Sequence, residues 1–347
     1  MTPAGAGPVV GGRPVRPWRK TRIQNGCAGC TQVRSWRWPR GGDREVTAAW
    51  KRWPGRSSRA GDPPQMLTVG GRVLRVAVRV GNPARPPLLL CNGIGAGLEL
   101  LQPFVDALDP DREIIRFDLP GIGGSPLPVI PYHFATLPPM LAGLLDRLGH
   151  RQADVLGISW GGGLAQQFAL RRPSRVRRLV LVATGTGTLM VPARPRVLRH
   201  MLTPRRHRDP RYAVSIAGEI YGGSMRADPS RAGAVLHSAA RAGQRRGYYY
   251  QLLAGAGWTS LPLLPLLRHP TLLMAGDDDP IIPLINARIM HRLITHSELH
   301  IYRGGHLDLI AEPHRLAPVV EAFLTAKTMP ATMPATTSAT TPGRTST

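Results

Sequence analysis

The fold of this chain is constrained most by an alternation of short apolar runs with segments of helical periodicity. The apolar runs are PLLLCNG (87–93), EIIRFDLPG (113–121), ADVLGIS (153–159), RRLVLVATG (177–185) and TLLMAGDD (271–278). Helical patterns occupy 98–108, 135–148, 162–171, 284–294 and 314–325. Further strands are expected at 72–80, where apolar and polar residues alternate, and at 298–306. The alternation predicts an α/β fold, with an open, mostly parallel sheet and helices on both faces.

The same pattern divides the chain into five segments. Residues 66–185 and 263–325 hold the expected core, and residues 186–262 between them look helical and loop-like. Ligands of such sheets bind outside the carboxyl ends of the strands, so an insertion over that edge predicts a helical lid. Residues 1–65 form a basic, tryptophan-rich leader, and residues 326–347 form a Thr/Ala/Pro-rich tail that we expect to be disordered.

The net charge of +24 invites a nucleic-acid partner. However, all of the 45 Lys and Arg residues except Lys20, Lys51 and Lys327 are arginines, in a chain that is also rich in Ala, Gly and Pro. This composition is typical of a GC-rich genome, so we expect no specific nucleic-acid partner. We expect the first segment to be a disordered leader, or the product of a start codon assigned upstream of Met66. A basic arm that binds nucleic acid or an anionic surface is the alternative.

Cysteine usage and hydropathy bear on location and cofactors. Cys27 and Cys30 form one CxxC pair and Cys91 stands alone, which suits a reducing cytoplasm and leaves a structural zinc site without its second pair. The sequence has neither an apolar run long enough for a transmembrane helix nor the apolar stretch of a signal peptide. We therefore expect a cytoplasmic protein that uses no metal and no organic cofactor.

Residues 157–163 read GISWGGG, with Ser159 between Gly157 and Gly161. A strand is expected before this serine and a helix after it, which is the context in which G-x-S-x-G marks a nucleophile. The glycines are small where strand and helix cross closely, and the helix N-terminus offers free N–H groups to a developing oxyanion. The pattern predicts that Ser159 is a nucleophile. The alternative is a tight turn that happens to contain a serine.

A serine nucleophile needs a base, and the base needs a group that orients it. His306 follows a strand and two glycines at the carboxyl edge of the sheet, and it is the expected base. Five other histidines lie in helix ends or polar stretches and are expected at the surface: His150, His200, His207, His291 and His296.

The orienting carboxylate is expected in GDDDPIIP (276–283), which follows the strand before it. Three adjacent carboxylates cannot all be buried, and Asp279, just before Pro280, is the expected orienter. Its neighbours Asp277 and Asp278 are expected to form the turn. The order Ser159, Asp279, His306 is the chain order of α/β-hydrolases.

Two glycine-rich loops lie at the same edge. CNGIGAG (91–97) can aim a backbone N–H at an oxyanion, and the expected donors are the amides of Ile94 and Trp160. A plain turn is the alternative for this loop. FDLPGIGGS (117–125) breaks the spacing of a dinucleotide fingerprint, and we expect its Asp118 to be structural.

Together these stretches resemble the α/β-hydrolase superfamily and, within it, the intracellular medium-chain-length poly(3-hydroxyalkanoate) depolymerases. The resemblance covers about 68–325 and rests on NGIGAGLELLQPF, FDLPGIGGS, GISWGGGLAQQFA, IYGG, GYYYQLLAGAGWTS and AGDDDPIIPLINAR. It implies an esterase that cleaves storage polyester on cytoplasmic granules, with Ser159, Asp279 and His306 on the triad positions. It also implies that Asn92-Gly93 stands where the superfamily commonly has His-Gly.

A water-insoluble polyester requires an apolar approach surface, and the expected lid offers one. Tyr248, Tyr249, Tyr250 and Trp258 are expected to line an acyl tunnel or touch the granule, unless they pack a small core of the lid. The alternatives to a depolymerase are a carboxylesterase or thioesterase for small soluble acyl substrates and a cofactor-free perhydrolase. A non-catalytic, basic granule- or nucleic-acid-binding protein is the alternative from another class.

Overall fold

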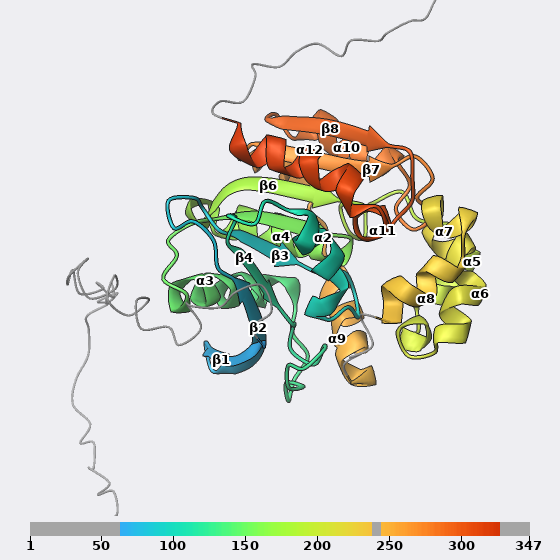
Figure 1. Cartoon of the computed structure of the whole chain (residues 1–347), viewed down its shortest axis with the longest axis horizontal. Helices are drawn as coiled ribbons and strands as arrows, with labels where there is room; N and C mark the ends of the chain where they lie inside the picture. Colours follow the sequence, from blue (N-terminus) through green and yellow to red (C-terminus); the bar gives the residue numbers. More distant parts are fainter. Residues whose placement is uncertain (1–62, 238–243, 327–347) are drawn as a thin grey trace, which may run out of the picture. The chain divides into compact units, whose positions relative to one another are not determined.

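The computed structural model describes residues 63–237 and 244–326, which form a single eight-stranded sheet with helices around it (Figure 1). The strand order is β1-β2-β4-β3-β5-β6-β7-β8. The pairs β1–β2 and β2–β4 are antiparallel, and all other neighbours are parallel. The strands are β1 (Gln65–Val69), β2 (Arg72–Arg79), β3 (Leu88–Cys91), β4 (Ile114–Phe117), β5 (Ala153–Ile158), β6 (Val176–Val182), β7 (Thr271–Gly276) and β8 (Ser297–Tyr302). This topology confirms the expected α/β fold class.

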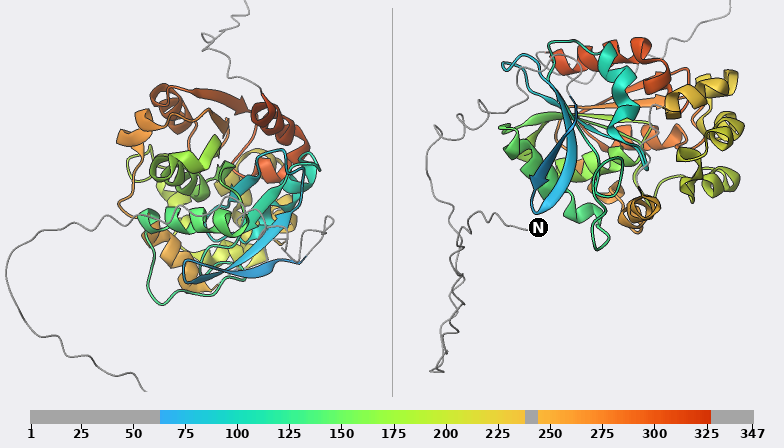
Figure 2. Two further views of the ribbon diagram at one scale, coloured as in Figure 1. Left: turned by 90° about the vertical axis from the view of Figure 1, so that its left-hand side faces the viewer. Right: turned by 60° about the horizontal axis from the view of Figure 1, so that its bottom comes forward.

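Helices cover both faces of the sheet, as the turned views show (Figure 2). They are α2 (Gln102–Ala107), α3 (Pro138–Arg147), α4 (Trp160–Arg171), α10 (Ile285–Leu293), α11 (Asp308–Ala311) and α12 (Pro313–Thr325). Successive residues of a strand point to opposite faces of the sheet, so a buried strand contributes side chains to the hydrophobic clusters on both faces. Leu88 and Leu90 of β3 pack in the cluster that includes α2 and α12. Leu89 packs in the other cluster, with α3, α4 and α10.

A helical insertion separates β6 from β7, and we define it as residues 183–270. Figures 1 and 2 show α5 to α8 grouped at one side of the sheet, with α9 apart from them. Asp209 starts α6 as an N-cap, because its carboxylate accepts the Tyr212 N–H at 3.1 Å. The insertion contains α5 (Pro195–Met201), α6 (Pro210–Tyr221), α7 (Gly223–Ala227), α8 (Ser230–His237), α9 (Arg245–Gly255) and a 3₁₀ turn at Leu261–Leu266.

The first strand was not expected from the sequence. β1 pairs with β2 through a two-residue turn at Gly70 and Gly71, whose φ angles of 54° and 77° favour glycine. Gln65 pairs with Val76, so the strand begins one residue before the expected boundary between leader and core. Residues 1–62 of the leader, with Cys27 and Cys30, and residues 327–347 of the tail lie outside the described residues.

Candidate active site

Ser159 occupies the sharp turn between β5 and α4. It has φ 55° and ψ −121°, in the left-handed half of backbone space that side chains rarely adopt. Hydrogen bonds hold both main-chain groups of this residue, because Ser159 N–H donates to Val182 O at 2.9 Å and the Thr184 hydroxyl donates to Ser159 O at 2.7 Å. A strained residue fixed by its surroundings is typical of a functional position.

Gly157 and Gly161 permit the close crossing of β5, α4 and the β3 strand end. A Cβ on Gly161 would lie 2.1 Å from Cys91 O, and one on Gly157 would lie 2.3 Å from Gly161 O. Both clashing atoms belong to the backbone, so no change of side-chain rotamer can relieve the clash. The glycines flanking Ser159 are therefore required by the space available, as the sequence pattern predicted.

We expect Gly161→Ala to lower the free energy of unfolding by about 1–3 kcal/mol, because its methyl group overpacks against the β3 backbone. Gly233→Ala in α8 is the matched control, since its Cβ would meet only Val214 Cγ2 at an ordinary 3.4 Å. The control substitution should leave stability unchanged or raise it slightly, because alanine has a higher helix propensity than glycine. Urea unfolding of both variants measures the difference, and equal stability would contradict the close-crossing explanation.

His306 and Asp279 meet Ser159 at the carboxyl edge of the sheet. His306 Nε2 lies 3.0 Å from Ser159 Oγ, and His306 Nδ1 lies 2.8 Å from Asp279 Oδ2. His306 and Asp279 are both buried, with 3% and 7% of their surface exposed. The structure thus brings the three residues singled out by the sequence into one hydrogen-bonded series, in the geometry that nucleophile, base and orienter require.

The three neighbouring aspartates make different contacts. Asp279 Oδ1 accepts the N–H groups of Ile281 and Ile282 at 2.9 Å each, which leaves Oδ2 for His306. Asp277 accepts Gly304 N–H at 2.9 Å. Asp278 is exposed and pairs with Arg226 at 2.9 Å, and this guanidinium lowers the pKa of the carboxyl group. Only Asp279 contacts the histidine.

The β3–α2 loop lies against the serine turn and is held rigidly. Asn92 Oδ1 accepts Gly93 N–H at 2.9 Å, and Asn92 Nδ2 donates to Gly97 O at 2.6 Å. Gly95 N–H donates to Gln251 Oε1 of α9 at 2.7 Å. Ile94, between these anchors, lines the same cavity as Ser159. Trp160 is the first residue of α4, where an N–H has no acceptor within the helix.

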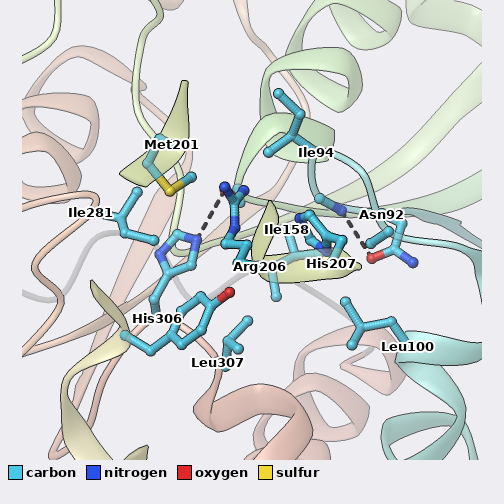
Figure 3. Close-up of a pocket in the computed structure, with 14 residues that line it drawn as sticks. Asn92, Ile94, Leu100, Ile158, Met201, Arg206, His207, Ile281, His306 and Leu307 are labelled. Carbon is cyan, nitrogen blue, oxygen red and sulfur yellow. Dashed lines mark hydrogen bonds between the residues drawn. The ribbon is translucent and has the colours of Figure 1, made fainter. Parts of the chain in front are cut away.

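Ser159 and His306 open onto a cavity with about 30 Å³ of free volume (Figure 3). Its apolar wall consists of Ile94, Ala96, Leu100, Ile158, Met201, Ile281 and Leu307. Its polar wall, besides Ser159 and His306, consists of Asn92, Gly93, Arg206, His207 and Tyr221. An apolar space beside a serine and a histidine can hold an acyl chain at the point of attack.

None of the four aromatic residues expected to bind substrate lines this cavity. Tyr248 is buried behind it, and its hydroxyl contacts Arg206 Nη1 at 3.0 Å. Trp258 stacks on Phe134 and donates from Nε1 to Gln167 Oε1 at 3.0 Å, so it packs the core. Tyr250 packs against the same core cluster, and Tyr249 is exposed.

His207 corrects one expectation, because it is half-buried and faces the cavity instead of lying open at the surface. It lines the cavity, and its buried Nε2 atom has no hydrogen-bond partner among the described residues. Burial and the charge of Arg206 hold the pKa of His207 well below its usual value. Sequence analysis also missed Arg206 and Met201 of the cavity wall, because the irregular insertion gives no periodic signal for an inward-facing residue.

Asp118 has the structural role expected of it. It is fully buried, accepts N–H groups of Leu98 and Gly124 at 2.7 Å each, and pairs with Arg75 at 3.1 Å.

Cys91, at the end of β3, is no rival nucleophile, because burial raises the pKa of its thiol to about 12. Within residues 63–237 and 244–326, no group of three His, Cys, Asp or Glu side chains is placed to hold a metal ion. None of the described helices is long and apolar enough to cross a membrane.

Comparisons with known proteins agree with this architecture. The family model of the alpha/beta hydrolase fold matches residues 86–313. A poly(3-hydroxyalkanoate) depolymerase of Ectopseudomonas oleovorans is 51% identical over 252 residues, which cover 72% of this chain and 88% of that protein. The 3-oxoadipate enol-lactonase 2 of Acinetobacter baylyi is 26% identical, over 70% of this chain and 90% of that protein. The enol-lactonase structure from Burkholderia xenovorans superposes with a TM-score of 0.65 at 22% identity, covering 76% of this chain and all of that one.

Proposed function

The chain belongs to the α/β hydrolase family and hydrolyses ester bonds, and we propose that its substrate is intracellular poly(3-hydroxyalkanoate) with medium-length side chains. The observation that carries this proposal is the 51% identity to the Ectopseudomonas depolymerase over most of both chains. The hydrogen-bonded series of Ser159, His306 and Asp279 supports it from the geometry. Clearing of a latex of that polyester by the purified enzyme is the direct test.

The proposed reaction proceeds through an acyl-enzyme. Ser159 Oγ attacks the ester carbonyl while His306 Nε2, 3.0 Å away, takes its proton. Asp279 holds the histidine by Nδ1 and stabilises the imidazolium. His306 then gives the proton to the leaving hydroxyl of the next 3-hydroxyacyl unit. Water activated by the same histidine releases the acyl group from Ser159 as a carboxylic acid.

The proposed oxyanion donors are two backbone amides on different elements. Trp160 N–H stands at the start of α4, where the helix dipole also favours negative charge. Ile94 N–H lies in the loop that Asn92 and Gln251 anchor. Two fixed donors aimed at one oxygen stabilise the tetrahedral intermediate without reorganising during the reaction.

The cavity is smaller than a medium-length acyl chain needs. Its free volume of about 30 Å³ compares with roughly 300–1,000 Å³ for sites that enclose small molecules. Met201, which lines it from the end of α5, belongs to the helical insertion. We propose that the insertion acts as a lid, whose displacement with Met201 enlarges the acyl site. The cavity as it stands, with its small free volume, favours short soluble esters, and hydrolysis of such esters is the second candidate function.

An exposed apolar surface provides a granule contact in this proposal. Val129 and Ile130 are 97% and 70% exposed, on the loop that leads from the Asp118 region to α3. The same loop touches α9, where a Cβ on Gly121 would lie 3.0 Å from Gly247 Cα. Tyr249 and Leu253, one helical turn apart on α9, are also exposed. We propose that this surface adsorbs to polyester granules in the cytoplasm.

The double substitution Val129→Ser and Ile130→Ser should lower the rate of latex clearing at least tenfold relative to the rate on soluble p-nitrophenyl octanoate. Each buried Val or Ile contributes about 1.5–3 kcal/mol to adsorption, and 1.4 kcal/mol corresponds to a factor of ten. Ile301→Ser is the matched control. Ile301 is 43% exposed and lies on the edge strand β8, outside the proposed granule contact. An unchanged ratio in the double variant would exclude this surface as the granule contact.

A further inference from the structure

The cavity wall holds a buried cation that the proposed mechanism does not use. Arg206, in the 3₁₀ turn Pro204–His207, is only 3% exposed. Its Nη1 donates to His200 O at 3.2 Å, to Thr203 O at 3.5 Å and to the Tyr248 hydroxyl at 3.0 Å. All of these acceptors are neutral. Across the described ranges, no carboxylate lies within ion-pair distance of this guanidinium.

Burying a guanidinium without an anion is costly, because the charge loses its hydration and gains no opposite charge. Arg75 and Arg112, buried elsewhere, pair with Asp118 and Glu321. Arg116 and Arg178 also donate to neutral oxygens, but neither lines the cavity of Ser159. Arg206 therefore combines burial, a missing counter-ion and a position in the wall of the candidate active site.

His207 adds a second unsatisfied group to the same wall. Its Nε2 atom is buried without a hydrogen-bond partner in the described part of the chain. The ring packs against the loop of the proposed oxyanion site, since a Cβ on Gly95 would lie 2.9 Å from Nε2. Because its lowered pKa keeps the imidazole neutral at pH 7, His207 can hydrogen-bond a polar ligand without adding charge. Figure 3 shows Arg206, His207 and His306 around one cavity.

We propose that Arg206, with His207 beside it, binds the free carboxylate of the terminal unit of the polyester or of a short oligomer. This inference rests on the proposed function and specifies it: the ester cleaved is the one next to the acid end of a chain. The leaving group is then the terminal 3-hydroxy acid, whose hydroxyl oxygen receives the proton from His306. Three bonds separate that oxygen from the carboxylate carbon, which is consistent with His306 and Arg206 lining the same cavity.

The test compares one pair of substrates, a charged dimer and its neutral counterpart. One is the linear dimer of 3-hydroxyoctanoate as the free acid, and the other is its methyl ester. The wild type should prefer the acid in kcat/KM, and Arg206→Met should reduce that preference by about 10- to 100-fold, the range for hydrogen bonds to a charged group. Arg206→Lys should restore part of the preference by returning the charge. General damage to the fold would slow both dimers equally and leave the ratio unchanged.

Arg205→Met is the matched control, because Arg205 is exposed and pairs with Asp209 at the surface. Its ratio of acid to ester should equal that of the wild type. A second measurement needs no variant: 3-hydroxyoctanoate should inhibit hydrolysis of p-nitrophenyl octanoate at least tenfold more strongly than its methyl ester does.

Equal use of both dimers by the wild type, together with equal inhibition, would overturn the carboxylate site and leave the depolymerase function intact if latex is still cleared. Failure on latex and on both dimers, with p-nitrophenyl octanoate still cleaved, would overturn the proposed function and this inference together.

Discussion

Replacing Ser159 by alanine should lower kcat on p-nitrophenyl octanoate by about 10⁶-fold, the loss seen when a serine nucleophile is removed from a triad. Alanine deletes the hydroxyl oxygen that lies beside His306 and is placed to attack the carbonyl, while His306 and Asp279 keep their 2.8 Å contact. The residual rate should come from the oxyanion donors and substrate binding alone. A stopped assay at high enzyme concentration measures so large a loss.

Ser215→Ala is the matched control for that variant. Ser215 lies on α6 of the insertion, and its hydroxyl donates to Tyr212 O at 2.9 Å, one turn back along the helix. Its kcat should stay within about twofold of the wild type, as for most surface substitutions. If Ser159→Ala retained wild-type activity, the strained turn would be structural only, and the nucleophile would have to be sought elsewhere.

Asp279→Asn should cost about 10⁴-fold in kcat, because an amide in place of Oδ2 no longer fixes the productive tautomer of the histidine. The substitution is nearly isosteric, and the other oxygen can still accept the Ile281 and Ile282 amides. The fold should therefore survive, and circular dichroism of the variant would verify this. The loss should appear in kcat rather than KM, since Asp279 acts through His306 and contacts no substrate.

The neighbouring aspartates supply matched controls within the same loop. Asp277→Asn retains an acceptor for Gly304 N–H, and Asp278→Asn removes an exposed pair with Arg226. Exposed pairs contribute about 0–1 kcal/mol, so both variants should keep most of their activity. A larger loss for Asp277→Asn or Asp278→Asn than for Asp279→Asn would assign the orienting role to a neighbour.

The sheet and the nucleophile turn were predictable because they depend on local patterns. Buried parallel strands require continuous apolar runs, and the turn after β5 requires small residues on both sides of Ser159, so both leave a mark on the sequence. β1 was missed because its five residues are partly exposed and lie next to a segment without periodicity. The choice among three aspartates rested on one proline. The contacts around Asp279 now distinguish it from its neighbours.

The cavity wall contributed by the insertion could not be predicted in this way. His207 appeared to be a surface residue because it follows two arginines in a polar stretch, yet the fold places it against Gly95. Tyr248 and Trp258 appeared suited to contact substrate, yet one supports Arg206 and the other packs on Phe134. These positions depend on how the insertion docks on distant loops, which hydrophobic periodicity does not encode.

The most direct test of the account is the turbidity of a medium-chain-length polyester latex, followed beside p-nitrophenyl octanoate hydrolysis for the wild type and Ser159→Ala. We predict that the wild type clears the latex and cleaves the soluble ester, and that the variant does neither. Cleavage of the soluble ester by a wild type that leaves the latex turbid would contradict the polyester assignment.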